Sequence, residues 1–196
     1  MSYLWSFHSF PTQAFGRVFG GAQPAEVEDF VGFLQSEFCG LDRFPGAPAL
    51  ARNVLSTGLS YDGLDAASAR IVDEIVGVAF SPEGFEQVLQ LDHLSPDGLH
   101  SSVVSELLAR AKAGAPPTLL PILQKGRRYG QRESSPCEYC ILAEGEVPLL
   151  LDEVRRAMAA SLPWSDSWVP EVVQECLEGP VAAAASQKRA LFGRLC

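Results

Sequence analysis

Residues 119–142 read LLPILQKGRRYGQRESSPCEYCIL and join a helical front half of the chain to a helical tail. The stretch starts with an apolar segment, continues with the densest run of positive charge in an acidic chain, and closes on two cysteines and an Ile-Leu pair. This pattern predicts a short helix over residues 118–124, a basic loop, and a strand over residues 137–143. The chain is therefore expected to change from helix to strand and back within one short connection.

Amphipathic helices are the main feature on both sides of this connection. The strongest pattern covers residues 147–162, where apolar residues recur at positions 147, 150, 151, 154 and 158. Two other helices have good starting residues, because Pro24 suits a first helical position and Asp65 suits an N-cap. Further helices are expected over residues 12–19, 24–38, 49–57, 66–80, 101–113, 170–177 and 180–195.

Two short segments resemble each other, SPEGF from Ser81 and SPDGL from Ser95. Each offers a serine for the N-cap, a proline for the first helical position and an acid in the first turn. We therefore predict a helix start at each segment. Nothing longer recurs, so a repeat architecture is not expected.

The aromatic segment YLWSFHSF, residues 3–10, predicts a strand that Pro11 ends. Strand alternation would place Trp5 and Phe7 on the face opposite His8. With 196 residues the chain is long enough to bury a core without disulfides. We predict a mainly α (α+β) fold, in which residues 1–196 form a single globular domain of about seven to nine helices with a small two- or three-stranded sheet.

The composition limits the classes of partner. Hydrophobic residues make up 47% of the chain, charged residues 20%, and the net charge is −9. An acidic chain is a poor non-specific binder of nucleic acid but suits a soluble protein or one that meets a basic partner. No segment approaches the ~20 apolar residues of a membrane-spanning helix, and no export signal is visible. Five cysteines without framework spacing favour a reducing, cytoplasmic location, and the composition is typical of a bacterial protein.

The basic loop is the first candidate site. Arginine forks bind carboxylates and phosphates, and the neighbouring glycines would let backbone N–H groups approach an anion. The predicted anion- or partner-binding residues are Lys125, Arg127, Arg128, Tyr129 and Arg132. The alternative is that the run compensates a helix dipole and pairs with surplus surface acids, which is the more ordinary role of such charge.

Cys137 and Cys140 form a CxxC pair that could be half of a zinc site or a redox pair. Against both roles, residues three apart on a strand point to opposite faces, and cysteine is often simply buried. The other ligand candidates would be Cys39, Cys176, Cys196 and the histidines. The pair is therefore only a weak metal candidate.

His8, His93 and His100 are the candidate acid–base groups, with Asp92 and Asp97 near the last two. Such groups act together only when the fold brings them to one cleft, and sequence neighbours on a helix do not face each other. No serine-nucleophile or metalloprotease motif accompanies them. We assign no catalytic residue and expect no cofactor.

Three functions are compatible with these residues. The leading hypothesis is a non-enzymatic cytoplasmic protein that binds another protein, as an adaptor, an inhibitor or an immunity-type antidote. The alternative is a small-molecule or anion-binding enzyme with a pocket between helices near the basic loop 125–132. A third hypothesis is a structural zinc protein that uses Cys137 and Cys140.

Overall fold

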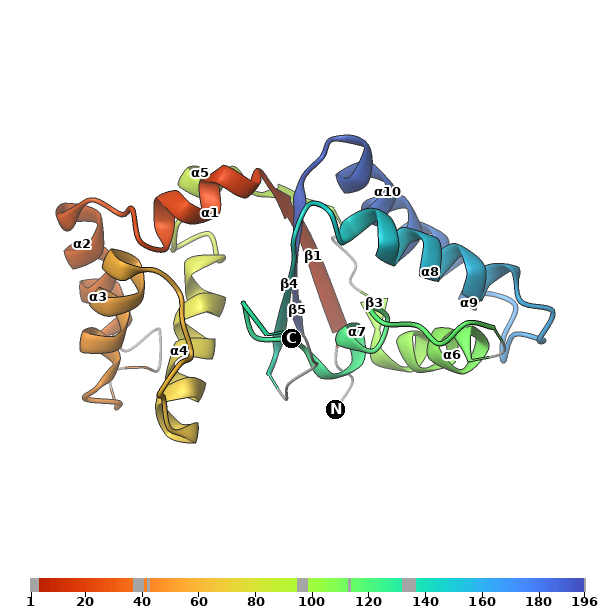
Figure 1. Ribbon diagram of the computed structural model, residues 1–196, viewed down its shortest axis with the longest axis horizontal. Coiled ribbons are helices and arrows are strands. Elements are labelled where there is room, and N and C mark those ends of the chain that lie inside the picture. Colours follow the sequence, from red (N-terminus) through yellow and green to blue (C-terminus); the bar gives the residue numbers. More distant parts are fainter. Residues whose placement is uncertain are drawn as a thin grey trace. The chain divides into compact units, whose positions relative to one another are not determined.

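The computed structural model (Figure 1) describes residues 4–36, 41, 43–94, 99–112, 114–131 and 137–195. Contacts between Cα atoms divide the chain into two compact units. The first unit combines residues 1–10 with 92–196, and the second unit is the segment Pro11–Leu91 between them. The second unit is thus an insertion that follows the N-terminal strand of the first. One globular domain over residues 1–196 stays a prediction, because two compact units can belong to one domain.

A small antiparallel sheet lies in the first unit. Its strands are β1 (Leu4–Phe10), β2 (Asp92–His93), β3 (Leu99–His100), β4 (Tyr139–Leu142) and β5 (Ala190–Leu195). The order is β2-β1-β5-β4, and β3 also pairs with β1. The two ends of the chain are therefore neighbours, since Phe7 on β1 faces Gly193 on β5. The predicted strands over residues 3–10 and 137–143 are confirmed as β1 and β4.

Strand β5 replaces the second half of the helix predicted over residues 180–195. The helix ends at Ser186, and Lys188 adopts a left-handed φ of 53° that turns the chain into β5. Leu191 and Phe192 are both buried because β5 lies between β1 and β4 with both faces covered. A continuous apolar run of this kind does not show the alternation of a half-exposed strand. The helical prediction for these residues was therefore wrong.

Helices supply most of the core of the first unit. They are α6 (Ser101–Ala111), α7 (Ile122–Lys125), α8 (Val147–Ala159), α9 (Val169–Val173), the π-helical turn η1 (Gln174–Glu178) and α10 (Gly179–Ser186). Figure 1 shows α8 and α10 side by side, and both pack into one hydrophobic cluster with Trp5 and Phe7 of β1. The predicted apolar stripe of residues 147–162 is confirmed, since Leu150 and Val154 are fully buried in this cluster.

The second unit consists of helices. They are α1 (Thr12–Val18), α2 (Pro24–Leu34), α3 (Ala47–Thr57), α4 (Ala66–Ala79) and α5 (Glu86–Leu89). Two predicted starts are confirmed: Pro24 is the first residue of α2, and the Asp65 side chain accepts a hydrogen bond of 2.7 Å from the Ser68 N–H. Phe38, at the predicted end of α2, lies outside the described residues.

The segment SPEGF does not begin a helix at Ser81, so that prediction was wrong. Helix α5 begins at Glu86, and the Ser81 hydroxyl donates back to the carbonyl of Val78. Gly84 explains the difference, because an added Cβ would lie 2.2 Å from that same carbonyl oxygen. The segment is therefore a tight turn against the end of α4. The similar segment at residues 95–98 lies outside the described residues.

The mainly α-helical class with a small sheet is confirmed. The sheet has more strands than the two or three expected. Strands β2 and β3, which have only two residues each, were not predicted, and β5 was predicted as helix. Strands of two residues carry no periodicity that a sequence pattern can reveal.

Candidate functional site

Arg127, at the centre of the basic loop, is buried in an ion pair. Its Nη1 and Nη2 atoms donate to the two carboxylate oxygens of Glu146 at 2.8 and 2.6 Å, and Nη2 also donates to the Ile141 carbonyl at 2.9 Å. The Arg127 N–H donates to the Tyr139 carbonyl, so the loop is also fixed along its backbone. Hydrogen bonds from Arg127 and from the Ala143 N–H outweigh burial and hold the pKa of Glu146 below its ordinary value. The guanidinium thus joins the loop to the start of α8.

The other loop residues differ in their surroundings. Gly126 has a φ of +76°, and an added Cβ would lie 2.1 Å from the Cys137 carbonyl oxygen. Only glycine therefore fits at this position without a shift of the backbone. Lys125 and Tyr129 are exposed, Arg128 is half-buried, and Arg132 lies outside the described residues. The prediction that this loop binds an anion or a partner stays a prediction, and any ligand would have to compete with Glu146 for Arg127.

Replacing Arg127 by alanine is expected to lower the free energy of unfolding by about 2–3 kcal/mol, because it leaves a half-buried carboxylate without its partner. Chemical denaturation measures this change. The matched control is Lys125→Ala, an exposed cation of the same loop, with an expected change within about 0.5 kcal/mol. Equal effects of the two substitutions would show that Arg127 does not anchor the loop.

Cys140 is a buried thiol of β4. Burial, with the neighbouring Cys137, raises its pKa to about 12, so it stays protonated at neutral pH. A metal ligand or a nucleophile has to be a thiolate. Cys137 precedes the strand, and its Sγ donates to the Tyr139 carbonyl at 3.1 Å. Within the described ranges, no group of three His, Cys, Asp or Glu side chains could hold a metal ion.

The three histidines do not share one site. His8 and His93 face each other across β1 and β2, with ring centroids 4.4 Å apart in an edge-to-face arrangement. His100 instead starts α6, where its Nδ1 accepts a hydrogen bond of 3.2 Å from the Ser102 N–H. The predicted acid–base candidates therefore divide into a cross-strand pair and a helix cap.

Two further buried charges were not among the predicted site residues. Arg110 of α6 donates to carbonyls at the end of α8, and its guanidinium lies over the Trp164 ring, 3.6 Å from the centroid. Glu153 of α8 accepts four hydrogen bonds from the segment Thr118–Leu120. The charged groups of Arg110 and Glu153 thus bind backbone groups of the end of α8 and of the segment Thr118–Leu120.

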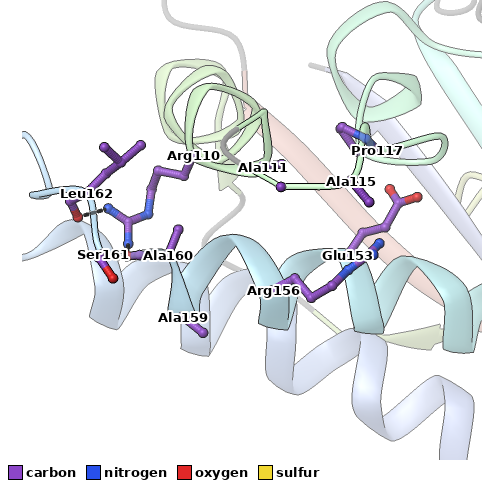
Figure 2. Close-up of a pocket in the computed structure, with 11 residues that line it drawn as sticks. Arg110, Ala111, Ala115, Pro117, Glu153, Arg156, Ala159, Ala160, Ser161 and Leu162 are labelled. Atoms are coloured by element: carbon purple, nitrogen blue, oxygen red, sulfur yellow. Dashed lines mark hydrogen bonds between the residues drawn. The ribbon is translucent and has the colours of Figure 1, made fainter.

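A pocket of about 530 Å³ lies beside these two groups (Figure 2). Figure 2 shows Arg110 at one end and Glu153 at the other, with a dashed line from Arg110 to the Leu162 carbonyl. Apart from the exposed Arg156, the other lining residues are small or apolar. The pocket is thus between helices, as the alternative hypothesis expects, but it is lined by residues outside the loop 125–132.

A second pocket, of about 340 Å³, lies within the unit Pro11–Leu91. It combines three carboxylates with three phenylalanine rings. The carboxylates are Glu26, Asp29 and Glu83, and the rings are Phe30, Phe33 and Phe85. The part of this pocket that α2 contributes could have been predicted from the sequence. A helix whose acidic residues border its apolar stripe presents carboxylates and apolar side chains next to each other.

The chain matches no protein-family model, no curated protein and no solved structure at a significant level. Over the described ranges, none of the helices has both the length and the apolar character needed to cross a bilayer.

Proposed function

We propose that this chain is a non-enzymatic protein-binding protein, an adaptor, inhibitor or immunity-type antidote, whose partner offers a basic surface to the unit Pro11–Leu91. The observation that carries the proposal is the uneven distribution of charge between the two compact units. Residues 11–91 contain 11 acidic and four basic residues, a net charge of −7 out of −9 for the whole chain. The remaining residues contain 13 acids and 11 bases, a net charge of −2.

Such an asymmetry gives one part of the protein a field that attracts and orients a basic partner. Complementary charge raises the association rate and disfavours wrong partners. Two basic residues of the first unit are not available to a partner, since Arg110 and Arg127 are buried and their guanidinium groups bind internal acceptors. The acidic unit therefore supports partner binding better than the basic loop does.

The test compares two charge reversals of equal size on a partner isolated by affinity capture, identified and then produced in pure form. Asp62→Lys with Glu74→Lys alters exposed acids of the acidic unit, and Glu138→Lys with Glu144→Lys alters exposed acids of the first unit. We expect the first pair to weaken binding by about tenfold or more, because two attractive charges become repulsive. The second pair should change the dissociation constant by less than about twofold.

Binding to the unaltered chain should also weaken as salt is raised, because exposed charges are screened. Isothermal titration calorimetry at two salt concentrations gives both results. If the two charge reversals act equally, or if the partner has no basic surface, the proposal is wrong.

A further inference from the structure

The pocket of the acidic unit has one wall made by a single face of α2. Glu26, Asp29, Phe30 and Phe33 are spaced i, i+3, i+4 and i+7, so they lie along one side of the helix. The Glu26 carboxylate is held in place, because it accepts a hydrogen bond of 2.8 Å from the Gln23 N–H in the capping box of α2. Asp29 is exposed, and the ranges that the structure describes give it no ion pair.

The second wall is the turn before α5, together with Gln87 and Val88 of α5 itself. Gly84 lies against the last carbonyls of α4, and the Phe85 N–H donates to the Ala79 carbonyl at 2.8 Å. The Phe85 ring contacts that of Phe30, with centroids 4.9 Å apart, so the two walls meet in an aromatic floor. Glu83 is exposed on this second wall. Each wall therefore supplies at least one carboxylate and at least one phenylalanine ring.

We propose that this pocket receives an arginine side chain of the partner, an inference that rests on the proposed function and names what the acidic unit recognises. A guanidinium is planar, stacks on aromatic rings and binds carboxylates through a fork of N–H donors. Its three-carbon stem suits an apolar wall. A volume of about 340 Å³ is at the small end of ligand sites, which fits one long side chain better than a folded element.

Other occupants match the lining less well. A divalent cation needs several converging oxygen ligands, and among the described residues no three carboxylates come close enough together to hold one. A purely apolar side chain would take water from the carboxylates without returning a hydrogen bond. A lysine ammonium is a compact, strongly hydrated charge that neither stacks flat nor forms a fork. Arginine alone uses the rings and the carboxylates together.

The experiment titrates the ¹⁵N-labelled full chain with acetyl-arginine N-methylamide and follows the amide resonances by NMR. The matched probe is acetyl-citrulline N-methylamide, which has nearly the same shape without the charge. We expect the amides of Phe30, Phe33, Gly84 and Phe85 to shift with a dissociation constant on the order of 1 mM, as befits one side chain. Citrulline should bind at least about tenfold more weakly.

The variant Asp29→Asn with Glu83→Gln should weaken arginine binding by at least about tenfold. The matched control, Asp62→Asn with Glu74→Gln, removes the same charge from acids that do not line the pocket and should change it by less than about threefold. Arginine and citrulline shifts of equal size, shifts centred away from these four amides, or equal effects of the two variants would overturn the inference. If the pocket variant leaves partner affinity intact while Asp62→Lys with Glu74→Lys reduces it, the pocket assignment fails and the proposed function stands.

Discussion

Replacing Arg110 by methionine is expected to lower the free energy of unfolding by about 3–5 kcal/mol, the largest effect of any change considered for this protein. The Arg110 side chain is 3% exposed. Its Nε donates to the Ala157 carbonyl at 3.0 Å, and Nη2 donates to Met158 and Ala160 at 3.2 and 2.6 Å. Nη1 donates to the Leu162 carbonyl.

These carbonyls belong to the end of α8 and the residues after it, where a helix leaves its last C=O groups without internal partners. A guanidinium there also opposes the negative end of the helix dipole. Methionine keeps most of the length and apolar contact of arginine but no donor, so several carbonyls lose their hydrogen bonds. Urea denaturation measures the difference in unfolding free energy.

Arg155→Met is the control for this substitution. Arg155 lies within α8 itself, but its side chain is exposed. It pairs with the half-buried Glu178, and an ion pair with an exposed member contributes about 0–1 kcal/mol. A loss of less than about 1 kcal/mol in Arg110→Met would show that water satisfies the end of α8 without the guanidinium.

Glu153→Gln is expected to cost about 3–4 kcal/mol, although it changes almost no volume. One carboxylate oxygen accepts from the Thr118 N–H at 2.7 Å and its hydroxyl at 2.9 Å, and the other accepts from Leu119 and Leu120 at 2.9 Å each. All four partners are donors, and an amide NH₂ placed there would meet two of them with further donors. Glu144→Gln, an exposed acid just before α8, is the control and should change stability by less than about 0.5 kcal/mol.

The same carboxyl predicts how stability depends on pH. Burial opposes ionisation of Glu153, but the hydrogen bonds from Thr118, Leu120 and Leu119 outweigh it, so its pKa lies below the ordinary 4.5. The unfolded chain then holds the proton more tightly than the folded one. The stabilisation is present above about pH 4.5 and is lost as the pH falls through the lowered pKa.

Urea denaturation at about pH 7 and about pH 3 tests this linkage. The unaltered chain should lose more stability between the two values than Glu153→Gln, which has no carboxyl to protonate at this position. Equal losses would mean that Glu153 has the same pKa in the folded and unfolded states.

The candidate site was only partly predictable. The sequence predicted Arg127 as a binding cation. Its ion pair with Glu146 could not be predicted, because the two residues are 19 positions apart and no local pattern relates them. Glu153 and Arg110 did leave a local signal, since each interrupts an apolar stripe, Glu153 between Leu150 and Val154 and Arg110 three residues after Leu107. A charge at such a position is either a break in the stripe or a buried group with partners, and only the fold distinguishes the two.

By itself the sequence determined the mainly helical class, the positions of most helices and the strand at residues 4–10. These features follow from local causes, because apolar spacing, proline and capping residues act within a few positions of the chain. The excess of acidic over basic residues in residues 11–91 is also a property of the sequence. It can act as one charged surface only because those residues form one compact unit.

The tertiary structure alone decided that the two ends of the chain pair, that residues 190–195 form a central strand, and that the buried charges of Arg110, Arg127 and Glu153 hold α8 and its neighbours. The physical reason is that these features satisfy backbone and ionic groups across long separations in sequence, 188 residues for Ser6 and Arg194. Local propensity contributes little there, because hydrogen bonding and burial between distant segments determine which conformation the chain adopts.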